Sequence, residues 1–215
     1  MLEPTVTAAN TLNIWGRMSS INVKKVVWTA QELGLDFQRT EAGGQFGVVK
    51  TPEFMRLNPN STVPVIEDED FVLWESNVIV RYLCAKHSFG QLYPTPLRER
   101  FAAEQWMDWQ QTSHNPALTR VFWNLIRQPG SVSEAEFADV SAKVERAMDI
   151  LEEALARSPW LGGETFTMAE CALAPGVHRY LHLPMERKPR PHLARWYEAV
   201  LQRPVAHQIL LLPLT

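Results

Sequence analysis

A carboxylate and a hydroxyl lie together where an apolar run ends. The stretch "FVLWES" finishes in Glu75 and Ser76. The apolar residues after it have helical spacing: Val78, Ile79, Tyr82 and Leu83. At a helix start, a serine hydroxyl and unpaired backbone N–H groups form a site for an anion, and Glu75 beside it can bind an ammonium group. Serine is also a common helix cap, so Ser76 has a purely structural interpretation as well.

A second polar group precedes an earlier helix. The turn "GRMSS" carries Arg17, Ser19 and Ser20. The apolar positions of a helix follow it, at Val23, Val26, Val27 and Ala30. The helix dipole and the free N–H groups of its first turn favour a negative charge at this place. The alternative is a pair of capping turn serines beside a solvated arginine.

The elements that must position these residues form two sets. In the first 85 or so residues, "TLNIW" and "LDFQRT" predict strands on either side of a helix, and "TVPVI" and "FVLW" predict a hairpin. A helix between the first two strands permits parallel pairing, whereas the short turn "EDED" requires antiparallel pairing, so the predicted sheet is mixed. Residues 41–61, rich in glycine and proline, predict a long functional loop.

The remainder of the chain predicts helices. Residues 87–96 contain glycine and two prolines and have the composition of a linker. Ser133 with Glu136 and Thr167 with Glu170 are helix-capping signatures, and Pro204 is expected to end a late helix. The pattern therefore predicts two domains, an α/β domain over residues 10–86 and an all-helical domain over residues 98–215.

Composition excludes several classes of function. The 215 residues are 46% hydrophobic and 21% charged, as in a folded globular protein. With a net charge of −3 and no basic run, no nucleic-acid partner is expected. No signal peptide or long apolar run is seen, which predicts a cytoplasmic protein that does not enter a membrane. Cys84 and Cys171 lack metal-ligand spacing, so we expect buried free thiols and no metal.

Four stretches together resemble the cytosolic glutathione transferases, most closely the bacterial serine-type, theta-like members. They are "GRMSSINVKKVVWTAQELGL", "TPEFMRLNPNSTVPVIEDEDFVLWESNVIVRYL", "FTMAECALAP" and "PHLARWYEAVLQRP". The resemblance spans nearly the whole chain. It implies a thioredoxin-like N-terminal domain with a mixed sheet, a C-terminal helical-bundle domain, glutathione as co-substrate, and a homodimer active in detoxification.

The resemblance also assigns roles at the glutathione site. Val63 and Pro64 would be joined by a cis peptide bond and would present backbone groups to the cysteinyl part of glutathione. Glu75 and Ser76 would bind its γ-glutamyl end. Many relatives have a lysine or arginine just before the valine-proline pair, where this chain has Ser61 and Thr62. Candidates for binding the glycyl carboxylate are therefore sought nearby: Gln45, Lys50 and Asn58.

The thiolate of glutathione would be stabilised by a serine. Ser20 lies two residues before Asn22, which opens the helix, so the resemblance selects Ser20, with Ser19 as the alternative. Lowering a thiol pKa from about 8.5 by about two units requires roughly 2.7 kcal/mol. One or two hydrogen bonds to a charged group supply roughly that amount. The serine acts as a donor, because its hydroxyl is too weak an acid to be a base here.

The second substrate implied by the resemblance is a small hydrophobic electrophile. Its pocket is expected to include Trp123 and Tyr180. Arg17 is placed there too, because its charge could act on the thiolate or on an anionic substrate. The predicted activity is conjugation of this electrophile to the glutathione thiolate.

Other functions remain open at this stage. The neutral Ser61 and Thr62 also suit a glutathione-transferase-like scaffold that binds partners without turnover. A glutathione-dependent isomerase, dehalogenase or peroxidase would share the thiolate and differ in the pocket. A thiol-disulfide reductase that uses its own thiolate is disfavoured, because the first turn contains no cysteine.

Overall fold

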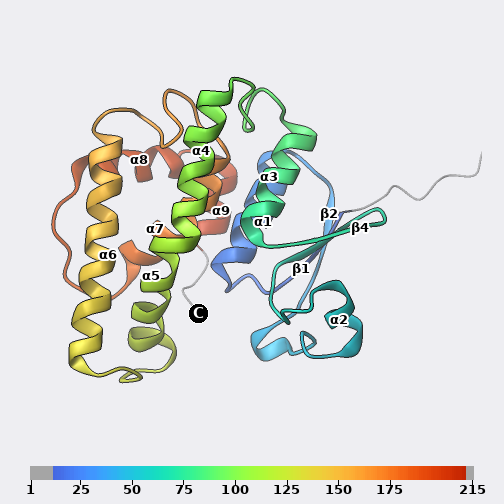
Figure 1. Cartoon of the computed structure of the whole chain (residues 1–215), viewed down its shortest axis with the longest axis horizontal. Coiled ribbons are helices and arrows are strands. Elements are labelled where there is room, and N and C mark those ends of the chain that lie inside the picture. Colours follow the sequence, from blue (N-terminus) through green and yellow to red (C-terminus); the bar gives the residue numbers. More distant parts are fainter. Residues whose placement is uncertain (1–11, 212–215) are drawn as a thin grey trace, which may run out of the picture.

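A four-stranded sheet occupies one side of the molecule and a group of helices the other (Figure 1). The computed structural model describes residues 12–211. The strands are β1 (Leu12–Trp15), β2 (Phe37–Thr40), β3 (Val65–Asp68) and β4 (Phe71–Trp74), in the order β2-β1-β3-β4. β1 and β2 are parallel, and the other two pairs are antiparallel. The predicted mixed sheet is confirmed.

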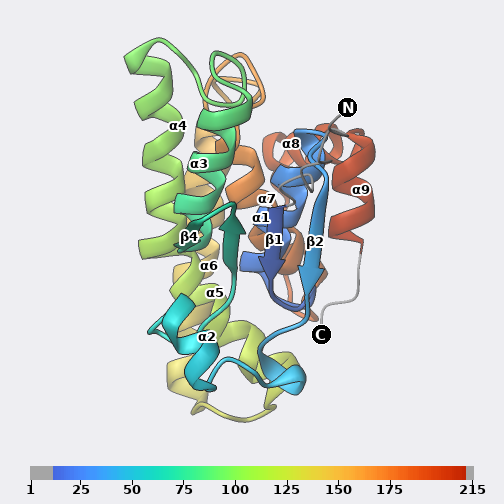
Figure 2. The ribbon, with the colours of Figure 1, turned by 90° about the vertical axis from the view of Figure 1, so that its right-hand side faces the viewer.

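Helices α1 (Ile21–Glu32) and α3 (Ser76–His87) lie between the sheet and the helices of the second half of the chain (Figures 1 and 2). α1 begins after Ser20 and ends before Gly34, whose φ of 66° is the left-handed conformation that suits glycine at a helix end. Most of α1 is buried, because the sheet domain covers one side and helical segments cover the other. Its start, which carries Ser20, is therefore fixed from both sides.

Residues 41–61 are more ordered than the predicted loop. They contain the short helices η1 (Gly44–Phe46) and α2 (Pro52–Leu57). The Thr51 hydroxyl accepts a hydrogen bond from Phe54 N at 3.3 Å, and Pro52 occupies the first turn, where its missing N–H costs nothing. The loop prediction was wrong for α2, because six residues are too few to show helical periodicity. The next strand also starts at Val65 rather than at residue 62.

The second half of the chain is helical, as predicted. After the linker, the first helical run consists of α4 (Leu97–Trp109), η2 (Gln110–His114), α5 (Asn115–Phe122) and η3 (Trp123–Arg127). η2 and η3 are π-helical turns, which are common at functional sites. The later helices are α6 (Glu134–Leu155), α7 (Met168–His182), α8 (Pro191–Leu201) and α9 (Pro204–Leu210).

Local signals set several of these helix ends. Thr167 and Glu170 form the complete capping box at the start of α7. Ser133 caps α6 by accepting from Glu136 N at 3.2 Å. Pro204 was expected only to end a helix, but it also begins α9, a role that suits its fixed φ.

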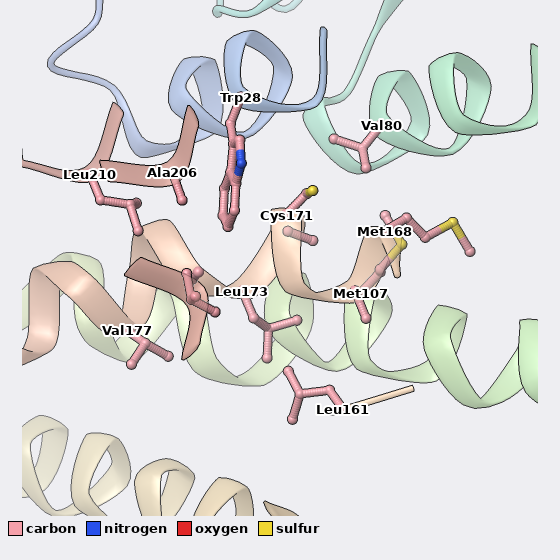
Figure 3. Packing of buried hydrophobic residues seen from close by; sticks show 14 of the residues in the cluster. Trp28, Val80, Met107, Leu161, Met168, Cys171, Leu173, Val177, Ala206 and Leu210 are labelled. Atoms are coloured by element: carbon pink, nitrogen blue, oxygen red, sulfur yellow. The ribbon is translucent and has the colours of Figure 1, made fainter. Parts of the chain in front are cut away.

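One hydrophobic core joins the two halves. Figure 3 shows Trp28 of α1 pointing toward α7 and α9, with Val80 of α3 and Met107 of α4 nearby. Trp28 is fully buried, and its Nε1 donates to Glu32 Oε2 at 3.0 Å. Glu32 in turn accepts from Arg203 Nε at 2.7 Å, next to α9. This shared packing holds α1 against the helical half.

Candidate active site

The valine-proline step leaves a pair of backbone groups without partners. The Val63–Pro64 peptide bond is cis, as the resemblance implied. The N–H and C=O of Val63 make no hydrogen bond to any residue within 12–211. The preceding loop is held by Asn58, whose Nδ2 donates to Thr62 O at 2.9 Å and whose Oδ1 accepts from Asn60 N at 3.0 Å. Asn58 is 1% exposed. The structure therefore corrects its expected role: Asn58 shapes the loop rather than facing a ligand.

The start of α3 provides a second binding element. Glu75 has a φ of 72°, an uncommon conformation for a residue other than glycine, and its side chain is exposed. Ser76 is 2% exposed. The backbone N–H groups of Ser76 and Asn77 make no hydrogen bond within the described part of the chain. This arrangement suits an anion beside a carboxylate, as expected.

A buried lysine lies directly behind Ser76. Lys25 is fully buried, and its Nζ donates to Ser76 Oγ at 3.4 Å, to Asn77 Oδ1 at 3.1 Å and to Gln110 Oε1 at 2.7 Å. Burial lowers the pKa of Lys25 to about 7, while the nearby charge of Glu75 opposes that shift. Because Lys25 occupies an acceptor lone pair of Ser76 Oγ, the Ser76 hydroxyl hydrogen can point toward a ligand.

The serine turn faces a cavity between the two halves. Ser19 and Ser20 line a cavity of about 130 Å³ that also contacts Phe122 and Trp123. The Ser20 hydroxyl accepts from Val23 N at 3.5 Å and so caps α1. A hydroxyl that accepts this bond still has its hydrogen to donate, so capping α1 and binding an anion are compatible.

A second cavity of about 250 Å³ shares Arg17, Ser19 and Arg127 with the first. Gln45 lines it, together with Glu41 and Phe46. Of the three predicted ligands for the glycyl carboxylate, the structure therefore brings Gln45 to the site. Lys50 is exposed and lines neither cavity.

Of the residues predicted for the second-substrate pocket, Arg17 and Trp123 line the cavity beside the serine turn. Tyr180 does not. It is 1% exposed, and its hydroxyl donates to Glu145 Oε1 at 2.6 Å and accepts from Arg190 Nη1 at 2.8 Å. The prediction for Tyr180 is corrected, because its polar end is bound within the helical half, where it lines a different cavity.

Two arginines that the sequence did not reveal complete the cavity. Arg127 comes from η3 and Arg179 from α7. Arg179 stacks on the Phe122 ring, with its guanidinium carbon 3.9 Å from the ring centroid, and donates to Ser19 O at 3.5 Å. Burial, together with the charges of Arg127 and Arg17, lowers the pKa of Arg179 to about 9. Lys25 was likewise missed, because it stands beside Lys24 in the sequence and its burial depends on packing against α3 and η2.

The cysteines are separate from this site. Cys84 and Cys171 are buried free thiols, as predicted. Burial raises the pKa of Cys84 to about 12 and also raises the pKa of Cys171. Both therefore stay protonated at neutral pH, and neither supplies a thiolate. Over residues 12–211, no group of three or more His, Cys, Asp or Glu side chains is arranged to hold a metal ion, and no helix is long and apolar enough to cross a membrane.

The fold is a thioredoxin-like domain joined to a helical-bundle domain. The features that define it are the strand order β2-β1-β3-β4, the cis proline before β3 and the helical half that follows. Sequence profiles agree with this description. Residues 10–85 match the glutathione S-transferase N-terminal domain, and residues 134–199 match the glutathione S-transferase C-terminal domain.

Known proteins share the full architecture. Glutathione S-transferase GstB of Escherichia coli K12 is 34% identical over 207 residues, which cover 95% of this chain and all of that protein. A crystal structure of the theta class glutathione S-transferase from Xanthomonas axonopodis pv. citri, with glutathione bound, has 36% identity and a TM-score of 0.91. That match covers 96% of this chain and 100% of the other. The chain belongs to the glutathione S-transferase family.

One relative is named for a different activity. The disulfide-bond oxidoreductase YfcG of Escherichia coli K12 is 30% identical over 201 residues, covering 88% of this chain and 90% of that protein. Family membership therefore supports a glutathione transferase and leaves the second substrate to be argued from this site.

Proposed function

We propose that this protein conjugates the thiolate of glutathione to an electrophilic carbon of a second substrate. One observation carries the proposal: Ser19 and Ser20 line a cavity where the first turn of α1 meets helices of the second half. Residues that suit glutathione lie in the first domain, and the cavity contacts side chains of the second. Such a boundary can bring two substrates together.

Glutathione binding would use the unpaired groups of the first domain. The N–H and C=O of Val63 would pair with the cysteinyl backbone of glutathione, and the start of α3 would bind the γ-glutamyl carboxylate. Glu75 would bind the neighbouring ammonium group. Gln45 is the candidate for the glycyl end, because it lines the cavity next to the serine turn.

The Ser20 hydroxyl would donate a hydrogen bond to the sulfur and favour its ionised form. The thiol proton leaves to solvent before the chemical step. The sulfur then forms a bond to the electrophilic carbon, and the leaving group departs with the electron pair of the broken bond. Stabilising the thiolate lowers the thiol pKa, which raises the reactive fraction at neutral pH.

Two single variants test the proposal. Ser20→Ala should raise the apparent pKa in the pH profile of kcat/KM and lower conjugation at neutral pH by about tenfold or more, since a hydrogen bond to a charged group is lost. Ser19→Ala should have a smaller effect. Ser131→Ala, which changes an exposed loop serine, is the matched control. Unchanged rates in both Ser20→Ala and Ser19→Ala would refute a serine-stabilised thiolate.

The relative YfcG makes disulfide reduction the second candidate. Because both cysteines of this chain are buried, the attacking thiolate would again be that of glutathione. It would attack a substrate disulfide, form a mixed disulfide and release the other sulfur as a thiolate. Release of a thiol from a small disulfide, faster than any conjugation, would favour this candidate. Isomerisation, dehalogenation and peroxide reduction would use the same thiolate. Assays with one substrate from each of these classes would separate them.

The family also supports a homodimer in the cytoplasm, which we include in the proposal. Light scattering at working concentration measures the assembly directly, and a mass of one chain would remove the dimer. A catalytically inactive scaffold would be favoured by the absence of glutathione binding.

A further inference from the structure

The cavity beside the serine turn has an unusual charge for a hydrophobic substrate. Three arginines line it: Arg17 from the turn before α1, Arg127 from η3 and Arg179 from α7. Within residues 12–211, no carboxylate lies at ion-pair distance from any of them. Other arginines of the chain do have carboxylate partners, as in Arg39 with Glu41 and Arg190 with Glu145.

Arg179 makes this imbalance specific. It is 6% exposed, and its Nε has no hydrogen-bond partner in the described part of the chain. A buried guanidinium without a counter-ion is unfavourable, so its retention at this place calls for an anion that joins it. Together with burial, the positive charges of Arg127 and Arg17 both lower the pKa of Arg179, which shows that the three guanidinium groups repel one another.

The surrounding groups do not supply that anion. Glu41 lines the adjoining cavity and not the one that contains Arg179, and its ion-pair partner is Arg39, whose Nη2 donates to Glu41 Oε1 at 2.6 Å. Within residues 12–211, Arg179 donates to the Ser19 carbonyl and stacks on the face of Phe122, and both groups are neutral. A ligand with a carboxylate or a similar anionic group would complete the cluster, because a guanidinium pairs with such groups through paired hydrogen bonds.

Glutathione has its own carboxylates, but both have places in the proposed binding mode. The γ-glutamyl carboxylate is assigned to the start of α3, and the glycyl end to the side of Gln45. The cavity that contains Arg179, Phe122 and Trp123 is the smaller one, at about 130 Å³. That is below the roughly 300–1,000 Å³ of pockets for drug-sized ligands, so its occupant is small.

We propose that the second substrate is a small anionic electrophile, bound through its negative group by Arg17, Arg127 and Arg179, with its reactive carbon facing the serine turn. This inference rests on the proposed conjugation of glutathione. A carboxylate with a leaving group on the adjacent carbon is the simplest member of the class. The sulfur bonds to that carbon while the leaving group departs with its electron pair, and the carboxylate is unchanged.

The arginines give this class a specific rate advantage. In water, the glutathione thiolate and an anionic electrophile repel each other, which slows their uncatalysed reaction relative to that of a neutral analogue. Within the cavity, three positive charges offset this repulsion. The enzyme should therefore accelerate the anionic member of a matched pair more than the neutral one.

Iodoacetate and iodoacetamide form such a pair, because they have almost the same shape and leaving group and differ in charge. The experiment measures kcat/KM for each at saturating glutathione and divides it by the uncatalysed rate constant. This ratio should be larger for iodoacetate by about tenfold or more, as expected from a hydrogen bond between charged groups. Added salt should reduce the advantage, because ions screen partly exposed charges.

Variants of the cavity arginines test whether these residues cause the rate advantage of iodoacetate. Arg127 is exposed, so Arg127→Gln should fold normally. It should lower the rate with iodoacetate by about tenfold while changing the rate with iodoacetamide by less than about threefold. Arg179→Gln should do the same. Because Arg179 lines only the cavity of about 130 Å³, Arg179→Gln should also leave the KM for glutathione within about threefold. Arg120→Gln, on the same helical run but outside both cavities, is the control and should change neither rate.

The outcomes separate the inference from the function on which it rests. Conjugation of iodoacetamide with no advantage for iodoacetate overturns the anionic substrate and leaves the glutathione transferase intact. Equal losses with both reagents in Arg127→Gln, or a higher KM for glutathione in Arg179→Gln without a selective loss toward iodoacetate, would show that the arginines serve glutathione and would also overturn it. Failure to conjugate either reagent removes the proposed function and this inference with it.

Discussion

The two halves of the candidate site are assembled in different ways. In the proposed binding mode, the glutathione half uses backbone groups of Val63 and the start of α3 at Ser76, which lie 13 positions apart in the sequence. The second-substrate half is formed by Arg17, Arg127 and Arg179, which meet only because distant elements pack together. In this proposal, a co-substrate common to the family would be bound by a local motif. The substrate particular to one enzyme would be recognised by residues that the whole fold brings together.

The largest expected effect on glutathione binding is that of Ser76→Ala. It removes the hydroxyl at the start of α3, and losing a hydrogen bond to a charged group weakens binding by roughly tenfold to a hundredfold. Calorimetric titration with glutathione measures the change, and Ser131→Ala is the control. Affinity within about twofold of the parent would mean that Ser76 only caps α3.

A smaller effect is expected from Lys25→Met. Without the Nζ that contacts Ser76 Oγ, the hydroxyl is no longer oriented, and loss of one ordinary hydrogen bond predicts roughly threefold to tenfold weaker binding of glutathione. Lys143→Met, an exposed lysine of α6, is the control. An unchanged affinity would make Lys25 a structural lysine only.

Lys25 also gives the protein a distinctive pH dependence. Its pKa of about 7 in the folded chain lies below its ordinary value of 10.5, so the unfolded chain holds a proton that the folded chain has lost between these pH values. The free energy of unfolding should therefore rise from pH 7 toward pH 10. Chemical denaturation across this range should show the rise in the parent and a flatter curve in Lys25→Met; parallel curves would contradict the assignment.

The sequence predicted the local half of the site better than the assembled half. Two apolar runs joined by a short acidic turn identified the hairpin, and Glu75 with Ser76 marked the start of α3, because such patterns arise from neighbours in the chain. Arg127 and Arg179 could not be found in this way, because their positions depend on η3 and on packing between helices. The Thr51-Pro52 signal for α2 was present but too short to outweigh the glycine-rich surroundings.

Acid should lower the free energy of unfolding through two buried histidines of the helical half. Burial lowers the pKa of His114 and of His178 to about 3, so both stay neutral in the folded chain while the unfolded chain gains protons below about pH 6.5. The unfolding free energy should fall from pH 6.5 toward 3, by up to about 1.4 kcal/mol per pH unit for each histidine. His114→Gln should reduce this slope, and His207→Gln, which changes an exposed histidine, should not. Equal slopes in the parent and His114→Gln would contradict this prediction.

The smallest effect is predicted for a charge pair that lines neither cavity. Arg120 and Glu136 form an exposed ion pair, with side chains 52% and 43% exposed. Such pairs contribute less than about 1 kcal/mol, because water screens them. Arg120→Gln should change the denaturation midpoint and both conjugation rates only slightly. A large loss of activity would mean that charges beyond the three lining arginines also act on the substrate.

The central claim, that the first domain binds glutathione and holds its sulfur as a thiolate, is tested most directly by calorimetry. Glutathione and S-methylglutathione would each be titrated near neutral pH in two buffers of different ionisation enthalpy. The methylated ligand has no thiol proton, so it corrects for protons taken up by Lys25 on binding of the carboxylate. We predict that glutathione binds and releases about one proton more than its methylated analogue, as a lowered thiol pKa requires. Absence of binding, or binding of both ligands with equal proton release, would contradict the account.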